Sequence, residues 1–524
     1  MKSPLTILFA GAGMPHAFDA AFGKESAFDR ALSWAEHVPG SVRTVIFTDG
    51  STHAPVEKAT AGKNVSLVRN DSWTSGMVAR EVAAACRDSG ADYAVYAWAD
   101  CPFLSAKLTS ELIETHVKYL AEYTFSDGYP YGLAPEIIDG GAAGILAALA
   151  EDVQKAAGEK PAGRDALFSI MSGDVNSFEI ETVIAPKDYR LLRLDFSCGD
   201  KINFLACRSL YEGFREKLSL DSAECNPVAL ADSAESSLCA LQTVPAFYGV
   251  QISARYNHVL PYVPCAALSR KHAAGDMPFD AFQKLVSEMA ELSEKAVVSL
   301  SAFGEPLLHP QFVDCVKEVL SHPGLSVLVE TDGTLVTPEL VAALTPLDAS
   351  RITWIVLLDA MESKLYAELH QCGEADFEKA VNAVGLLAAQ FPHNVYPQMT
   401  RMKANEAQLE PFYRYWKNRD NASAGELIVQ KYNSFCGALP DEKPADLSPL
   451  VRIPCWHLRR DMTILADGTV PFCQSQVLDS SAGNVLQDGI EAVWARFKEP
   501  LAAHLTKDYP QKCKACDEYY TFNF

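Results

Sequence analysis

Four cysteines near the C-terminal end have the residue type and spacing of ligands to a soft metal centre. They are Cys455, Cys473, Cys513 and Cys516, and the last two form a C-x-x-C pair. Asp467-Gly468 lies between the first two cysteines and predicts a hairpin turn that brings them together. Four thiolates at one point suit an iron–sulfur cluster or zinc, and the spacing alone does not separate these two.

The bulk composition sets limits on where and with what the protein works. The chain has 524 residues, of which 48% are hydrophobic, a net charge of −22 and 14 cysteines. This length predicts two to four domains. The negative charge argues against a nucleic acid or an anionic membrane as the main partner. Most cysteines are scattered singly, no apolar run approaches the roughly 20 residues that span a bilayer, and we therefore expect a cytoplasmic protein.

Alternation of apolar strands and helical stretches predicts an α/β fold in distinct regions. We expect an α/β domain over residues 1–200, with strands at 5–10, 43–48, 65–69 and 92–98, and a linker over the small and acidic residues 201–245. A second region, 246–435, has six β/α units, which predicts a parallel sheet curled into a partial barrel with chemistry at the C-terminal strand ends. Its strands are expected at 248–254, 296–301, 326–330, 352–358, 395–399 and 426–430. The region 436–524 is rich in loops and holds the four cysteines.

Two short motifs follow the second and third strands of this predicted barrel. They are Gly304-Glu305-Pro306 and Thr331-Asp332-Gly333. In this order they resemble the radical S-adenosylmethionine (SAM) superfamily, in which the GEP segment receives the amino group of SAM and the later segment shapes the pocket. The resemblance implies that Gly304, Glu305, Pro306, Asp332 and Gly333 form a SAM-like pocket. From the residues alone, Glu305 is equally a loop-shaping carboxylate, and Asp332-Gly333 reads as a simple turn.

The defining C-x-x-x-C-x-x-C motif of that superfamily is missing from the first strand's loop. Its three cysteine positions fall on Tyr256, Leu260 and Val263, although Asn257 and Tyr262 fit the surrounding frame. Leucine and valine have no donor atom, and a phenolate is a hard ligand. We therefore expect reductive SAM cleavage to be lost, and SAM binding stays open. A cluster assembled on Cys265 and Cys372 is the less favoured alternative.

The C-terminal region resembles the front half of the SPASM domain, a cluster-binding extension of peptide-modifying radical SAM enzymes. The pattern C-x12-G-x4-C over Cys455, Gly468 and Cys473 carries this resemblance, together with Gly483-Asn484-Val485 and Trp494. It implies one [4Fe–4S] cluster, with zinc as the alternative, because the sequence ends before the further cysteines of longer SPASM domains. Cys436 is a possible spare ligand.

The N-terminal region resembles GT-A-type (nucleotide-diphospho-sugar) transferases. Gly11 and Gly13 follow the first strand in the position of a nucleotide phosphate loop, and Asp100 stands where such enzymes bind a divalent metal. The nearest Lys or Arg after the glycines is Lys24. A simple helix cap is the alternative role for Asp100.

The order of the three regions resembles the spiro-SPASM protein family known from spirochaetes. It implies a GT-A-like domain, a partial (β/α)6 radical-SAM-type barrel and a small cysteine-rich SPASM extension. We expect an iron–sulfur protein that binds, relays electrons or acts as a scaffold for a peptide or protein partner. The alternatives are a nucleotidyl- or glycosyl-transferase acting through Asp100, and a SAM-binding protein without radical chemistry. The substrate and the oligomeric state are not predicted.

Overall fold

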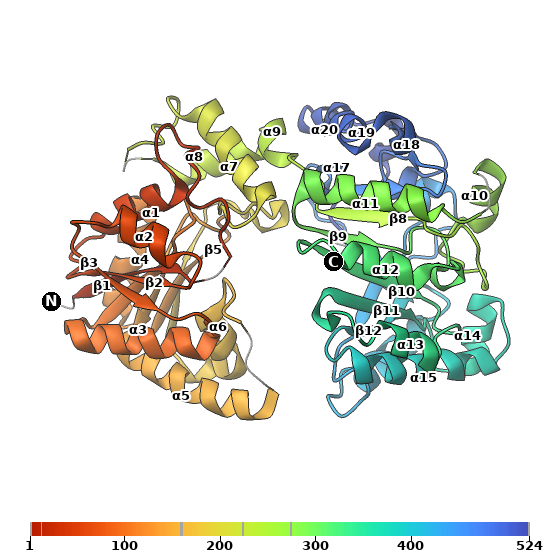
Figure 1. The fold of residues 1–524 in the computed structure, drawn as a ribbon, viewed down its shortest axis with the longest axis horizontal. Helices are drawn as coiled ribbons and strands as arrows, with labels where there is room; N and C mark the ends of the chain where they lie inside the picture. Colours follow the sequence, from red (N-terminus) through yellow and green to blue (C-terminus); the bar gives the residue numbers. More distant parts are fainter. Residues whose placement is uncertain (1–2, 12, 158–160, 223–224, 273–274, 522–524) are drawn as a thin grey trace. The chain divides into compact units, whose positions relative to one another are not determined.

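The chain divides into two compact units. The computed structural model describes residues 3–11, 13–157, 161–222, 225–272 and 275–521. The first unit is Met1–Thr243 and the second is Val244–Phe524. Figure 1 shows both, coloured along the sequence. Each unit contains its own seven-stranded sheet.

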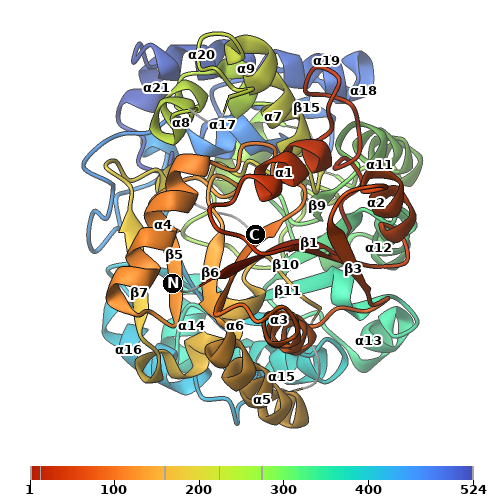
Figure 2. The same ribbon diagram turned by 90° about the vertical axis from the view of Figure 1, so that its left-hand side faces the viewer.

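The first unit is an α/β layer, as predicted. Its sheet has the order β3-β2-β1-β4-β6-β5-β7, and β6 pairs antiparallel with both of its neighbours. Strands β1 and β4 are buried along their whole length, because helices cover both faces of the sheet. Helices α3 and α5 lie together on one face, and α1 and α4 lie on the other (Figures 1 and 2). The strands are β1 (Pro4–Ala10), β2 (Thr44–Thr48), β3 (Val65–Arg69), β4 (Tyr93–Trp98), β5 (Tyr123–Asp127), β6 (Glu136–Asp139) and β7 (Ile180–Ile184).

The helices of this unit begin at capping residues. Thr74 accepts a hydrogen bond from the Met77 amide at the start of α3, and Ser105 accepts one from the Leu108 amide at the start of α4. The helices are α1 (Ala27–Glu36), α2 (His53–Ala59), α3 (Ser75–Ser89), α4 (Ala106–Tyr119), α5 (Gly140–Ala157), α6 (Ala166–Met171), α7 (Lys201–Phe214), α8 (Pro227–Glu235) and α9 (Leu238–Leu241).

The expected linker over residues 201–245 is wrong. Helix α7 buries Phe204, Leu210 and Tyr211, so this segment is part of the first unit. Asn226 caps α8, with a proline in its first turn, and such a cap is a regular helix start. The small residues of α8 pack closely, which explains why its composition looked like that of a linker.

The second unit is a curled, wholly parallel sheet. Its order is β13-β12-β11-β10-β9-β8-β14, so six strands follow one another in sequence as predicted. The strands are β8 (Phe247–Val250), β9 (Ala296–Ser299), β10 (Leu325–Thr331), β11 (Ile352–Leu357), β12 (Val395–Arg401), β13 (Ile428–Lys431) and β14 (Asp461–Ile464), with a small ladder of β15 (Thr469–Val470) and β16 (Gly483–Asn484). The seventh strand, β14, comes from the cysteine-rich region and pairs with β8. The expected boundary at residues 435 and 436 therefore does not separate two sheets.

Helices cover the outer face of this sheet, as right-handed crossovers require (Figure 1). The helices of this unit are α10 (Cys265–Lys271), α11 (Phe279–Ser293), α12 (Phe312–Leu320), α13 (Pro338–Leu344), α14 (Ser363–His370), α15 (Ala375–Gln390) and α16 (Leu409–Trp416), and the C-terminal region adds α17 (Trp456–Arg460), α18 (Val485–Asp488), α19 (Ile490–Ala495), α20 (Lys498–Leu505) and α21 (Gln511–Lys514). Helix α10 does not lie on the outer face, because its Leu268 packs against Phe303 and Leu465. Among the described residues, none of the helices combines the length and apolar character that a bilayer crossing needs.

Candidate functional site

The loop after β8 lines the barrel mouth with side chains that cannot hold a cluster. Leu260 packs against an apolar group on the inner strands that includes Phe247, Leu328 and Ile355. Val263 packs against a second group. This second group consists of Leu268, Ala302, Phe303, Phe435, Leu465 and Val477. The third position, Tyr256, lies beside the Cys265 thiol, and burial raises its pKa. None of the three side chains offers a sulfur, so the residues present do not fit a SAM-cleaving cluster.

Hydrogen bonds to neighbouring loops hold this segment in place. Asn257 Nδ2 donates to Thr334 Oγ1 at 2.9 Å. The Tyr262 hydroxyl donates to Asp359 Oδ2 at 2.6 Å, and Asp359 is fully buried. The loop therefore keeps its shape through contacts within the protein, without a metal.

The GEP motif locks the loops after the first three barrel strands together. Gly304 lies so close to the β8 loop that an added Cβ would stand 1.8 Å from the Ser253 carbonyl oxygen. The Glu305 carboxylate accepts bonds from Thr331 Oγ1 at 2.9 Å and from the Asp332 amide at 3.1 Å. It also accepts one from the backbone amide that follows Pro306. This geometry gives Glu305 a loop-shaping role.

Asp332 and Gly333 form a turn, as their simpler interpretation predicts. Asp332 Oδ1 accepts bonds from the Thr334 amide at 2.8 Å and from its hydroxyl at 2.6 Å. Gly333 has φ of 80° and no room for a side chain beside Val356. Burial and the neighbouring Asp332 raise the pKa of Glu305 to about 8. The predicted pocket residues therefore do gather at one place, as a buried acidic pair.

A cavity of about 320 Å³ opens at the C-terminal ends of the barrel strands. Its wall carries the carboxylates of Glu305, Glu330 and Asp332. Burial raises the pKa of Glu330 to about 7. On the C-terminal side the wall includes Lys431, which pairs with Glu518, and Cys473. The cluster of carboxyl groups on this otherwise largely apolar wall favours a ligand that carries a positive charge or an amine.

The four predicted C-terminal ligands surround a second cavity, of about 250 Å³. Cys455 precedes α17, and Cys473 precedes a short 3-10 turn. Cys513 lies in α21, and Cys516 follows it. All four line this cavity, and Cys473 also lines the barrel cavity.

The spacing of these sulfurs is wider than a single metal ion requires. Zinc–sulfur bonds of about 2.3 Å place tetrahedral thiolates about 3.8 Å apart. Among the described cysteines, no three sulfur atoms lie within 4.8 Å of one another. A larger centre such as an iron–sulfur cluster fits this arrangement better than zinc.

Burial makes bare thiolates costly at this site. It raises the pKa of Cys455 to about 12, and it also raises that of Cys513. Gln476 Nε2 donates to Cys513 Sγ at 3.1 Å. Cys436 lies beside Cys516 as a fifth sulfur, and its hydrogen bond lowers the pKa of Cys516 to about 7. The thiolates therefore need a compensating cationic centre.

In the first unit, the aspartate that was predicted to bind a metal forms an ion pair with an arginine. Asp100 is fully buried, and its two oxygens accept bonds from Arg164 Nη1 at 2.7 Å and Nη2 at 2.6 Å. The guanidinium also stacks on Trp98 at 4.2 Å. This bidentate pair leaves Asp100 poorly placed to bind a divalent metal, and Asp100 does not cap α4 either, because Ser105 does.

The two glycines of the predicted phosphate loop have different surroundings. An added Cβ at Gly11 would lie 2.3 Å from the Trp73 ring, whereas Gly13 has open space. Gly11 is therefore explained by packing. Residue 12, between them, lies outside the described residues.

Two features of the second unit escaped the sequence analysis. One is the cluster of His258, Cys372 and Asp376, and the other is the direct hydrogen bond between Cys516 and Cys436, which the sequence offered only as a possible spare ligand. The alternative pair of Cys265 and Cys372 gains no support, because Cys265 lies beside Tyr256. For the three-residue cluster, the sequence offers only His258 in the β8 loop as a hint, because Cys372 and Asp376 are more than a hundred positions away.

Comparison with known proteins places the chain in a family. Residues 455–517 match the SPASM family, described as an iron-sulfur cluster-binding domain. An uncharacterized protein of Treponema pallidum (strain Nichols) is 40% identical over 372 residues, which cover 68% of this chain and 98% of that protein.

Two solved structures resemble parts of the fold at low sequence identity. A cytidylyltransferase from Leptospira borgpetersenii matches 45% of this chain and 94% of its own, with 15% identity and a TM-score of 0.37. Streptococcus suis SuiB bound to precursor peptide SuiA matches 60% and 83%, with 13% identity and a TM-score of 0.42. At this level of superposition the likenesses say nothing about activity. The chain therefore belongs to the same family as the Treponema pallidum protein, and its residues 455–517 form a SPASM domain, described as binding an iron–sulfur cluster.

Proposed function

We propose that the protein carries a single [4Fe–4S] cluster and that its barrel binds a ligand without cleaving SAM. The cluster ligands would be Cys455, Cys473, Cys513 and Cys516. The observation that carries the proposal is that three separate segments bring these four sulfurs around one cavity. A cluster with four protein ligands has no open iron, and it serves electron transfer or structure.

The position of Cys473 supports an electron-relay role over a purely structural one. This residue lines both the cysteine cavity and the barrel cavity. A ligand in the barrel would therefore lie close to one ligand of the cluster. Backbone and side-chain donors on the sulfurs, such as Gln476 on Cys513, are the kind of contact that tunes a cluster's potential.

The barrel cavity supports a cationic or amine-bearing ligand. Its wall presents Glu305, Glu330 and Asp332, and the opposing Lys431 is already paired with Glu518. SAM, which carries an amine and a sulfonium, is one such ligand, and a basic peptide partner is another. Because Tyr256, Leu260 and Val263 cannot hold a cluster, SAM bound in this barrel would not coordinate iron, and a bound peptide would not meet a radical derived from SAM.

A reducing compartment, such as the cytoplasm, fits this proposal. All 14 cysteines are present as free thiols, including those that would ligate the cluster. Disulfides persist mainly in oxidising compartments, where this cysteine set would be at risk of oxidation.

Anaerobic reconstitution tests the proposal. The full chain, incubated with iron and sulfide, should hold the iron and sulfide of one [4Fe–4S] cluster and show its reduced-state electron paramagnetic resonance (EPR) signal. Cys513→Ala should lose both, and the exposed Cys239→Ala in the first unit serves as the matched control. Zinc in place of iron, with no sulfide, would contradict the cluster, and equal iron in both variants would contradict the ligand set.

A further inference from the structure

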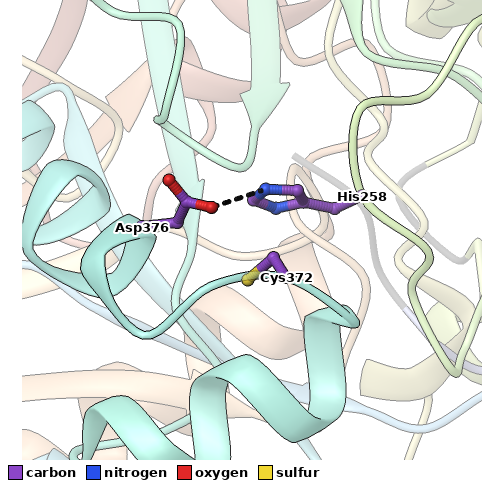
Figure 3. Close-up of side chains that lie close together, drawn as sticks. All are labelled: His258, Cys372 and Asp376. Carbon is purple, nitrogen blue, oxygen red and sulfur yellow. Dashed lines mark ion pairs between the residues drawn. The ribbon is translucent and has the colours of Figure 1, made fainter.

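A second group of metal-type donors lies beside the barrel mouth, apart from the four C-terminal cysteines. One ring nitrogen of His258, the sulfur of Cys372 and a carboxylate oxygen of Asp376 all lie within 4.8 Å of one another. Figure 3 shows the three side chains converging, with His258 on the β8 loop and the other two around the start of α15. His258 Nε2 lies 3.6 Å from Asp376 Oδ2.

The imidazole of His258 is buried between two carboxylates. The residue is only 8% exposed, and its Nδ1 has no hydrogen-bond partner among the described residues. Asp332 Oδ2 lies 3.4 Å from that Nδ1, on the side away from Asp376. With Nδ1 on the Asp332 side, the ring presents Nε2 to the carboxylate of Asp376, which belongs to the three-donor cluster.

Local structure fixes the two other donors. The Cys372 amide donates to the Ala367 carbonyl at 3.1 Å, and the Asp376 amide donates to the Gly373 carbonyl at 3.0 Å. Lys379 Nζ lies 2.7 Å from Asp376 Oδ1, which leaves Oδ2 facing the histidine. The three donors are therefore presented by turns that already exist, at a half-buried position that an ion can reach.

We propose that His258, Cys372 and Asp376 bind a divalent transition-metal ion of the zinc type. His258 would ligate through Nε2, and its Nδ1–H would point at Asp332, in the carboxylate–histidine–metal arrangement common in metal sites. One nitrogen, one sulfur and one oxygen are ligands that zinc accepts, and three protein ligands leave a fourth position open. His258 and Asp332 also line the barrel cavity, so a ligand there would lie next to the ion.

A bare ion pair explains the cluster less well. Without a cation, a buried imidazole faces two carboxylates and a thiol, while the only described lysine on Asp376 contacts its other oxygen. A bound ion would neutralise this group and satisfy the histidine ring. The proposal does not depend on the C-terminal cluster, because none of its ligands is shared with that site.

The test uses the full chain and reads each site separately. Co²⁺ and Zn²⁺ are added to the reconstituted protein, and alkylation of Cys372 by iodoacetamide is followed by peptide mass spectrometry. We expect one further equivalent of metal, a cobalt–thiolate absorption band and slowed alkylation of Cys372. His258→Gln and Asp376→Asn should abolish this protection, and Asp332→Asn should weaken metal affinity about 10- to 100-fold.

Matched controls separate loss of the site from loss of a charge. Asp314→Asn removes another aspartate that pairs with a lysine three residues on, and His322→Gln removes a half-buried histidine beside a glutamate. Both should leave Cys372 protected by metal. Unchanged alkylation of wild-type Cys372 with metal present, or metal bound only at the C-terminal cysteines, would overturn the proposal whatever those cysteines hold.

Discussion

The β8 loop and the C-terminal cysteine site are the two places where the sequence predicts an iron–sulfur cluster or its counterpart position. They differ in the side chains that stand at the ligand positions. The loop keeps its backbone frame through contacts such as Tyr262 to Asp359, but its ligand positions are Tyr256, Leu260 and Val263. The C-terminal site keeps four sulfurs around a cavity. The contrast teaches that protein contacts alone can hold this loop in place, whereas the cysteine site presents its donors around a cavity.

The two sites also differ in what would remain without a metal. At the barrel mouth, Leu260 and Val263 pack against apolar groups of the protein, so this packing does not depend on a bound cluster. At the C-terminal site, burial disfavours the charged thiolates, and the elements that carry them are short, such as α17 and α21. We therefore expect mutations at the C-terminal cysteine site to have the largest effect on metal binding.

The largest expected effect is complete loss of the cluster when one ligand is removed. Cys455→Ala should leave no bound iron, because three thiolates do not hold a fully ligated cluster stably in this site. Cys436→Ala should retain the cluster, although Cys436 lies beside Cys516. Iron analysis and EPR of both variants give the answer. Loss of iron in Cys436→Ala with retention in Cys455→Ala would show that the fifth sulfur is a ligand.

Placing cysteines at the three ligand positions of the β8 loop should create a second cluster site. The triple variant Tyr256→Cys, Leu260→Cys and Val263→Cys should bind about twice the iron of the wild type after reconstitution, if one further cluster forms. Leu260→Cys alone should bind none beyond the wild-type amount. Iron and sulfide quantitation checks this. A triple variant that folds but gains no iron would mean that the loop has lost the geometry as well as the ligands.

The first unit provides a third case, in which the buried carboxylate of Asp100 is neutralised by the guanidinium of Arg164. Arg164→Ala leaves Asp100 buried without its partner, which should cost about 3–5 kcal/mol of the free energy of unfolding. Arg190→Ala, which breaks an exposed pair with Asp188, should change the free energy of unfolding far less. Urea unfolding measures both. Similar small losses, or nucleotide–metal binding that Asp100→Asn abolishes, would instead favour a working transferase site.

The acidic barrel wall predicts a smaller, pH-dependent effect. Burial raises the pKa of Glu330 from 4.5 to about 7, so the folded state holds this proton more tightly than the unfolded state. Its stabilising contribution is therefore full below the unfolded pKa and is lost as the pH rises through the folded pKa. Between pH 5 and pH 8 the wild type should lose about 1–3 kcal/mol more unfolding free energy than Glu330→Gln. The free energy of unfolding is measured by urea denaturation at each pH. The same pH dependence in the wild type and in Glu330→Gln would contradict this prediction.

The sequence predicted what local patterns encode. The six barrel strands alternate with helices at regular intervals, and the Asp467-Gly468 turn is marked by its residue types. Strands β5, β6 and β7 were not predicted, because β6 reverses direction and β5 and β7 are only partly buried. Helix α8 was mistaken for linker despite its Asn226-Pro227 start.

The remaining features depend on contacts between distant segments. Asp100 and Arg164 are separated by 64 residues, and neither position has a signature that names the other. The pairing of His258 with Asp376 arises only when the β8 loop and α15 meet in the folded barrel. The seventh strand, β14, joins the sheet through β8 from the far end of the chain. Such pairings are properties of the topology, and composition or spacing does not reveal them.

EPR of the reduced, reconstituted full chain, recorded with and without SAM and combined with analysis for 5′-deoxyadenosine, tests the central claim most directly. We predict one cluster signal that SAM leaves unchanged and no 5′-deoxyadenosine. A signal that SAM shifts, together with 5′-deoxyadenosine formation, would contradict the account.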